Sequence, residues 1–200
     1  FDAATGQQVL QQGAHTDWVL GTTFSKDGSH VISVSRDMTA KLTEFATQRF
    51  VDNITSITPG ALKGGIQSVA AHPSRDEIVF GGSDGVPKVY RIYRNTARRI
   101  GDDANQIKQF PAMNGRIFTV AISRDGKRLA AGSALDNQGQ VAILPYPQEI
   151  DPKVAERIKQ IESKTVQERT PAEQEELAKL RAVQPSEQPV TVAIPSGVYA

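Results

Sequence analysis

The chain has 200 residues, of which 38% are hydrophobic and 22% charged, values that fit a globular protein and argue against wholesale disorder. Its formal net charge of +1 gives no general field for attracting nucleic acid or anionic lipid, so we expect no nucleic-acid partner. The absence of cysteine excludes disulfides, thiolate metal sites, covalently attached haem and cysteine nucleophiles, and no apolar stretch is long enough to span a membrane.

The first residues predict two strands around a turn. Phe1-Asp2 would end one strand, Thr5-Gly6 would form the turn, and residues 7–11 would form an outer strand. The sequence does not open with Met or with the basic and apolar segments of a signal peptide. Because both ends resemble parts of the repeat described next, we expect a fragment of a longer chain.

A pattern of short runs with alternating apolar residues occurs three times along the chain. In the first copy, residues 18–45, three runs are separated by turns at residues 25–28 and 36–38. The other copies span residues 67–93 and 117–144. Runs of about five residues with a period of two, broken by Asp-Gly turns, predict antiparallel strands joined by hairpins.

The spacing of the copies favours a particular architecture. Equivalent second-strand positions are Val31, Ile78 and Leu129, which are 47 and then 51 residues apart. Four-stranded propeller blades repeat with periods of roughly 40 to 50 residues. A fourth, outer strand is predicted at residues 49–54 in the first copy and 105–110 in the second.

The pattern changes between residues 147 and 189, where two helices are predicted. Asp151 precedes a proline and is a normal N-cap, and Thr170 with Glu173 has the spacing of a capping box. Apolar residues then recur at spacings of three and four, which indicates a helical stripe. We expect a helical hairpin inserted between the third and fourth strands of the last copy, with residues 190–200 forming its outer strand and the start of another blade.

The first copy resembles a WD40 repeat. The resemblance is carried by His15, by Phe24-Ser25-Lys26-Asp27-Gly28 and by Ser33-Val34-Ser35-Arg36-Asp37. The chain departs from the usual repeat in having Gly13-Ala14-His15 in place of an adjacent Gly-His pair, and Thr43-Glu44 in place of Trp-Asp. The later copies keep parts of the pattern, including Ala71-His72-Pro73 and Ser123-Arg124-Asp125-Gly126.

This resemblance covers about residues 1–146 and 190–200 and implies an all-β fold. We expect a partial, open WD40-type β-propeller of about three blades plus flanking strands, with first strands innermost. Three domain segments follow: blades over residues 1–146, the helical insertion over 147–189, and the outer strand with the start of the next blade over 190–200. Missing blades of the same chain would then be partners of this segment.

The resemblance also implies a structural hydrogen-bond network in the first copy. It would join His15 and Asp37 to Ser33 or Ser35, because a buried imidazole needs partners on both nitrogens. A catalytic Ser-His-Asp relay uses the same residue types but requires an exposed nucleophile and an oxyanion site. We predict the structural role and no catalytic residues.

Other candidate sites are weak. Three dispersed histidines without cysteine do not predict a zinc site, and no phosphate-binding loop or catalytic motif is present. The Asp102-Asp103 pair is more typical of a solvated turn than of a calcium loop. An arginine-rich segment at residues 91–99 is interpreted as an outer-edge face, although phosphate contact is an alternative. We expect no cofactor and no metal in this segment.

The predicted partner-binding surface lies at one end of the blades. Trp18, the only tryptophan, precedes a first strand, and Arg116 occupies the equivalent position in the third copy. Turns carrying Arg36 and Asp84 would lie beside them. Exposed aromatics next to arginines are enriched at binding hot spots, so a protein or peptide partner is predicted here. The alternative is that Trp18 packs against neighbouring loops.

The functional hypothesis is therefore a non-catalytic interaction scaffold. The segments Gly-Val-Pro-Lys-Val-Tyr (85–90) and Arg-Ile-Gly-Asp-Asp-Ala-Asn (99–105) also resemble the propeller part of large bacterial proteins that combine c-type cytochrome domains with WD40 repeats. That resemblance implies an alternative function as an accessory domain of a redox protein, with haem elsewhere in the chain. It would favour a periplasmic or other extracytoplasmic location, and without it a cytoplasmic one is expected.

Overall fold

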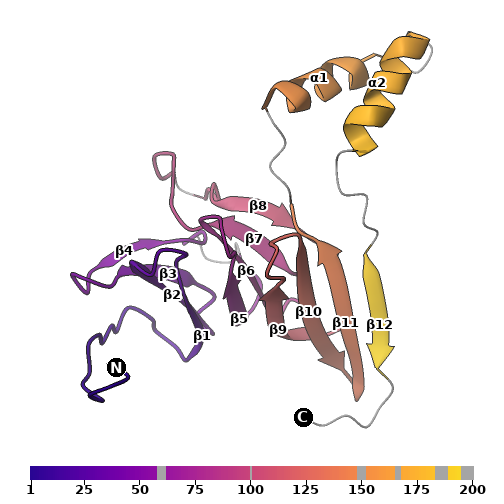
Figure 1. Ribbon diagram of the computed structural model, residues 1–200. Coiled ribbons are helices and arrows are strands. Elements are labelled where there is room, and N and C mark those ends of the chain that lie inside the picture. Colours follow the sequence, from indigo (N-terminus) through magenta and orange to yellow (C-terminus); the bar gives the residue numbers. More distant parts are fainter. Residues whose placement is uncertain (58–61, 100, 148–151, 165–167, 183–188, 195–200) are drawn as a thin grey trace.

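Three four-stranded antiparallel sheets stand side by side in the computed structural model, with two helices projecting away from them (Figure 1). The structure describes residues 1–57, 62–99, 101–147, 152–164, 168–182 and 189–194. Within each sheet the strands lie in chain order from first to fourth. This arrangement confirms the predicted all-β fold of three blades with an inserted helical hairpin.

The strands match the repeats seen in the sequence. Sheet 1 contains β1 (Val19–Phe24), β2 (His30–Ser35), β3 (Ala40–Glu44) and β4 (Phe50–Asn53). Sheet 2 contains β5 (Ile66–Ala71), β6 (Glu77–Gly82), β7 (Lys88–Arg91) and β8 (Gln106–Gln109). Sheet 3 contains β9 (Arg116–Ile122), β10 (Arg128–Leu135), β11 (Gln138–Pro145) and β12 (Val190–Ile194). The outer strands β4 and β8 fall within the ranges predicted for them.

The same turn chemistry joins the first two strands of sheets 1 and 3. In sheet 1 the N–H of Gly28 donates to the carbonyl of Ser25 at 2.9 Å, and Gly28 has a φ of 73° that favours glycine. In sheet 3 the N–H of Gly126 donates to the carbonyl of Ser123 at 2.8 Å. Short hydrogen-bonded turns of this kind fix the register of a hairpin. Both turns confirm the predicted Asp-Gly hairpins.

The three sheets also share a local irregularity. The register between first and second strands shifts at Val19/Gly21 in sheet 1, at Ile66/Ser68 in sheet 2 and at Gly132/Ser133 of β10 in sheet 3. A β-bulge of this kind bends and twists the strand that carries it. Its recurrence at the same step identifies the sheets as copies of one structural unit.

Alternate residues of the middle sheet form two separate cores. Ile78 and Phe80 of β6 pack with sheet 1, where they meet Ile32 and other buried side chains. Val79, between them, packs with Leu129 and its neighbours in sheet 3. Successive side chains of a strand point to opposite faces, so β6 is apolar on both sides and buried throughout. The first strands β1, β5 and β9 are neighbours in this order, as the propeller prediction requires.

Two sheet faces remain uncovered. On the far face of sheet 1, Phe24 and Phe50 lie at the two ends of one row of paired residues that crosses the sheet. Both are exposed. On the far face of sheet 3, Ile143 lies opposite Val190 in neighbouring strands, and both are exposed. The equivalent faces of the neighbouring sheets are buried where sheet 1 meets sheet 2 and where sheet 2 meets sheet 3.

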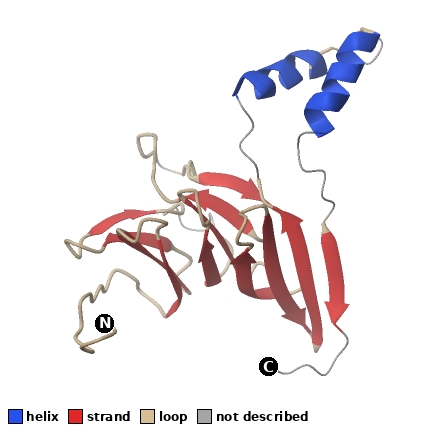
Figure 2. Ribbon diagram, in the orientation of Figure 1, coloured by secondary structure: helices blue, strands red, loops and turns tan. Residues whose placement is uncertain are grey.

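The helical hairpin lies between β11 and β12 and stands away from the sheets (Figure 2). It consists of α1 (Pro152–Glu162) and α2 (Pro171–Ala182). The hydroxyl of Thr170 accepts from the N–H of Glu173 at 3.2 Å, and the Glu173 carboxylate accepts from the N–H of Thr170 at 3.0 Å, which confirms the capping box. Ile161 and Leu177 are buried between the helices. The predicted cap at Asp151 lies outside the described residues.

The prediction of two strands before the first blade is wrong. Residues 1–17 form no strand, although the turn is present because Gly6 donates to the carbonyl of Asp2 at 2.9 Å. The carbonyl of Val9 accepts from the side-chain amide of Gln48 at 2.9 Å and is not part of a strand ladder. A strand needs a neighbouring strand to satisfy its backbone, and the described residues place none beside residues 7–11. The start of another blade, predicted after residue 194, lies outside the described residues.

No helix in the described parts of the chain is long and apolar enough to cross a membrane.

Candidate partner-binding rim

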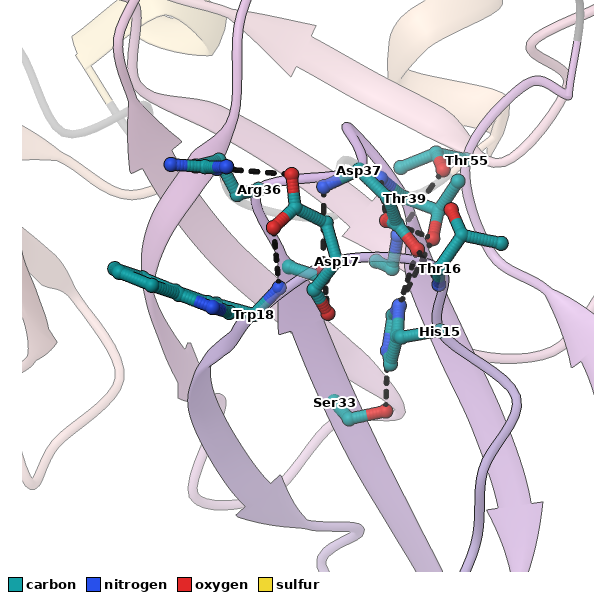
Figure 3. Close-up of polar contacts among 11 residues, drawn as sticks. His15, Thr16, Asp17, Trp18, Ser33, Arg36, Asp37, Thr39 and Thr55 are labelled. Atoms are coloured by element: carbon teal, nitrogen blue, oxygen red, sulfur yellow. Dashed lines mark hydrogen bonds and ion pairs between the residues drawn. The ribbon is translucent and has the colours of Figure 1, made fainter.

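Trp18 and Arg36 form an exposed pair at one end of sheet 1 (Figure 3). Trp18 immediately precedes β1 and is 70% exposed. The guanidinium of Arg36, in the turn between β2 and β3, lies 4.9 Å from the centroid of the indole ring. Its Nε donates to Oδ2 of Asp17 at 2.8 Å, and the backbone N–H of Arg36 donates to the carbonyl of Trp18 at 3.0 Å. The stack and both bonds hold the arginine in one position against the ring.

This end of sheet 1 continues directly into sheet 2. A Cβ added to Gly65 would lie 2.8 Å from the Cα of Arg36, so only glycine allows the turn of sheet 1 to approach the start of β5 this closely. Farther along, the N–H of Met113 donates to the carbonyl of Gly85 at 2.8 Å, which joins sheet 2 to sheet 3 just before Arg116. We call this continuous end the rim, defined as residues 15–18, 36–37, 63–65, 83–85 and 113–116.

The four residues predicted to bind a partner all lie on this rim, but their contacts differ. Trp18 and Arg36 contact each other, and Arg116 is exposed at the start of β9 without an ion pair among the described residues. Asp84 instead pairs with the ammonium of Lys88, and its Oδ1 accepts from the N–H of Val86 at 3.1 Å. Its carboxylate is therefore committed to the turn of its own sheet.

Below Trp18, His15 connects three parts of sheet 1 (Figure 3). Its Nδ1 lies 2.9 Å from Oδ2 of Asp37 and its Nε2 lies 2.8 Å from the hydroxyl of Ser33. These partners place the proton on Nδ1, which donates to the carboxylate, while Nε2 accepts from the serine. Ser35 is not bonded to the ring: its hydroxyl donates to the carbonyl of Asp17 at 3.1 Å and accepts from the N–H of Asp37 at 3.0 Å.

The carboxylate of Asp37 is the centre of this network. It accepts from the N–H of Thr16 at 3.0 Å and from the hydroxyl of Thr39 at 2.6 Å, in addition to the bond from His15. Burial alone would raise the pKa of Asp37, but hydrogen bonds from Thr39, His15 and backbone N–H groups outweigh it and lower the pKa to about 2. The group therefore stays charged and holds the strand ends together at neutral pH.

Two of the four arginines in the segment interpreted as an outer edge form ion pairs. Arg94 bonds both oxygens of Asp102, at 3.1 and 2.9 Å. Arg98 pairs with Asp52 of β4 in the neighbouring sheet. The Arg94–Asp102 pair lies within the loop after β7, whereas the Arg98 pair ties this loop to the preceding sheet.

Two features of the rim were not predicted from the sequence. The first is the bond from Arg36 to Asp17. The position of Asp17 directly before Trp18 was the signal in the sequence that could have indicated it. Gly65 makes room for Arg36, and its alignment with Trp18 in the repeat indicated the position without indicating why a glycine is needed. Among the described residues, no group of three or more acidic, histidine or cysteine side chains is arranged to hold a metal ion.

The three sheets, whose first strands are neighbours, define an open array of propeller-type blades, and the His15–Asp37 network lies in the first of them. Residues 6–43 match the family model described as "WD domain, G-beta repeat". The matched segment is the one that carries the polar network.

Known proteins with similar sequences include two kinds. The chain is 27% identical over 142 residues to "Eukaryotic translation initiation factor 3 subunit I" of Drosophila willistoni, which covers 66% of this chain and 41% of that protein. The corresponding protein of Danio rerio is 28% identical over 141 residues. "Striatin-3" of Rattus norvegicus is 31% identical over 90 residues, which covers 45% of this chain and 11% of that protein. The chain thus spans well under half the length of these relatives, and neither name refers to a cytochrome, so the cytochrome-linked alternative stays a prediction.

Proposed function

We propose that this chain is a non-catalytic protein-interaction scaffold whose rim binds a protein or peptide partner. The observation that carries the proposal is the pair formed by Trp18 and Arg36. A large indole ring is exposed to solvent, yet it is fixed by a stacked arginine that is itself held by Asp17. Rigid, exposed aromatic and arginine side chains bind partners at low entropic cost.

The contacts of the His15 network support a structural role for its residues. Ser33, His15 and Asp37 are bonded in the order of a catalytic relay, but the side chains of His15 and Asp37 are only 6% and 7% exposed. Ser33 lies within the paired strand β2, where its backbone is part of the ladder. The network joins the segment before β1 to β2 and to the turn after it, which is the geometry of a structural tie and needs no access for a substrate.

We further propose that other blades cover the two free sheet faces in a larger propeller. The exposed Phe24 and Phe50 on sheet 1 and Ile143 and Val190 on sheet 3 occupy faces that are buried at the inner junctions. Propellers leave only short, protected edges once their blades close around an axis. The greater length of the relatives supports this proposal.

The rim is tested by replacing Trp18 and Arg116 with alanine and measuring capture of partners from lysate by chemical cross-linking and pull-down. We expect at least a tenfold loss of the captured protein with an unchanged circular dichroism spectrum. Arg124→Ala is the matched control, because this exposed arginine lies in the turn between β9 and β10 at the opposite end of the sheets. Equal capture by the rim variant and the control would exclude the rim as the binding surface.

A further inference from the structure

The most deeply buried histidine lies between sheets 2 and 3. His72 follows β5 at the end opposite the rim and is only 3% exposed. Its ring centroid lies 4.7 Å from that of Tyr146, which follows β11 of the next sheet and is fully buried. The two rings therefore belong to the junction between the sheets.

The hydrogen bonds of His72 require a neutral ring. Nδ1 is approached by two backbone donors, the N–H of Ser74 at 3.2 Å and the N–H of Arg75 at 3.0 Å. Nδ1 can accept them only if the ring proton is on Nε2, which then donates to the carbonyl of Gly126 at 3.1 Å. That carbonyl belongs to the turn between β9 and β10, so one imidazole bonds both sheets.

The turn of sheet 3 is shaped to receive this ring. Gly126 has a φ of 69°, and a Cβ at this position would lie 2.5 Å from Nε2 of His72. Both the conformation and the space exclude a side chain. Glycine is needed here for the junction as well as for the turn.

Charged groups surround the ring on the side of sheet 2. Two guanidinium nitrogens of Arg75 face Nε2 of His72, Nη2 at 3.1 Å and Nε at 3.3 Å, and the guanidinium lies 4.7 Å from the ring centroid of Tyr146. The carboxylate of Glu77, on β6, lies 3.5 Å from Arg75. From sheet 3 the ring meets the backbone of Gly126 and the ring of Tyr146. The charged residues of the adjoining turn have exposed side chains; they are Arg124, Asp125, Lys127 and Arg128.

We propose that His72 is an acid-sensitive joint, which holds sheet 3 against sheet 2 while the imidazole is neutral and loosens the junction when it is protonated. A second proton on Nδ1 would point at the N–H groups of Ser74 and Arg75, replacing two attractive contacts by repulsive ones. The new positive charge would also lie beside the guanidinium of Arg75.

The pKa of His72 is shifted in the direction that favours the neutral ring. Burial lowers the pKa of His72 below its ordinary value of 6.5; the bond to the Gly126 carbonyl and the charge of Glu77 oppose this shift, the charge of Arg75 adds to it, and the net direction is downward. The folded chain therefore binds this proton less readily than the unfolded chain. The stabilisation is complete above about pH 6.5 and decreases as the pH falls below that value, by up to tenfold in the equilibrium constant per pH unit.

The test is amide hydrogen exchange of the full chain at pH 7.5 and pH 5.5, a range above the ordinary titration of carboxylates. We expect protection factors in β9 and β10 to fall roughly three- to tenfold at pH 5.5, after correction for intrinsic exchange rates. In His72→Asn, which cannot be protonated, protection should be lower at pH 7.5 and should not change with pH. The matched control His30→Asn, in sheet 1, should keep the pH dependence of the wild type.

A nitrogen NMR titration of the wild-type histidines keeps the proposal testable even if His72→Asn does not fold. We expect the His72 ring to remain neutral, with its proton on Nε2, to a lower pH than an exposed histidine. Titration of His72 at its ordinary pKa would overturn the proposal. So would a pH-dependent loss of protection in His72→Asn equal to that of the wild type.

Discussion

Sheets 1 and 2 have the same arrangement of strands but different side chains at equivalent positions. In sheet 1, His15, Ser33 and Asp37 form a polar network between the rim and the second strand. The equivalent residues of sheet 2, 47 positions later, are Leu62, Phe80 and Asp84. Leu62 and Phe80 are buried in the apolar core, and Asp84 pairs with Lys88.

The two sheets are therefore stabilised by different kinds of interaction. A network of directed bonds fixes the turn of sheet 1, whereas an apolar core supports sheet 2, which is buried between two neighbours. The family model ends at residue 43, with the blade that keeps the network. The matched range thus contains the hydrogen-bonded residues, and the repeated strand arrangement continues beyond it.

The largest expected effect is in sheet 2, at the position equivalent to Ser33. Phe80→Ala removes a buried ring that stacks on Tyr90 with centroids 4.9 Å apart. We expect a loss of about 3–5 kcal/mol in the free energy of unfolding, measured by urea denaturation. Ser33→Ala should cost only about 1 kcal/mol, because it removes one hydrogen bond. Equal losses for the two variants would show that the sheets do not differ in the way described.

A smaller loss is expected from Asp37→Asn, at about 2–3 kcal/mol, because several donors lose a charged acceptor. The folded-state pKa of about 2 lies below the unfolded value of 3.8, so this stabilisation is present above pH 3.8 and is lost as the pH falls towards 2. The wild type and variant should therefore converge in stability over that range. A constant difference between pH 6 and pH 2.5 would contradict a charged Asp37 at the centre of the network.

A further substitution, with a smaller expected effect than Asp37→Asn, gives sheet 1 the residue that sheet 2 has at the equivalent position. His15→Leu places the residue of sheet 2 into sheet 1, where Asp37 keeps its bonds from Thr16 and Thr39. We expect a loss of about 1–2 kcal/mol, because the bonds of His15 to Asp37 and Ser33 are removed while side-chain volume is retained. Leu62→Met is the conservative control and should cost less than about 1.5 kcal/mol. A stabilised His15→Leu chain would mean that the polar network serves something other than stability.

Much of the fold could be predicted because strand periodicity is a local signal. The alternation around Val31, Ile78 and Leu129 predicted the second strands, and Asp-Gly turns indicated the first hairpins of sheets 1 and 3. Residues 7–11 have a similar local character but form no strand, because strand formation depends on a partner that local sequence does not reveal.

The site was harder to predict because it depends on contacts between distant residues. Trp18 and Arg36 could be placed on one rim from the repeat alignment, but the commitment of Asp84 to Lys88 depends on how a lysine folds back within its own sheet. For His72 the sequence indicated only its place in the repeat pattern, in Ala71-His72-Pro73. Its bond to Gly126, 54 residues later, becomes visible only when the sheets are placed together.

The central claim is that the exposed Trp18 of the rim contacts the partner, and its fluorescence tests this most directly, since it is the only tryptophan. In the free chain we expect the red-shifted emission and ready acrylamide quenching of a solvent-exposed indole. Saturation with a captured partner, made with phenylalanine in place of its tryptophans, should shift the emission to the blue and reduce quenching several-fold. Unchanged emission and quenching in a complex shown to be saturated would contradict the account.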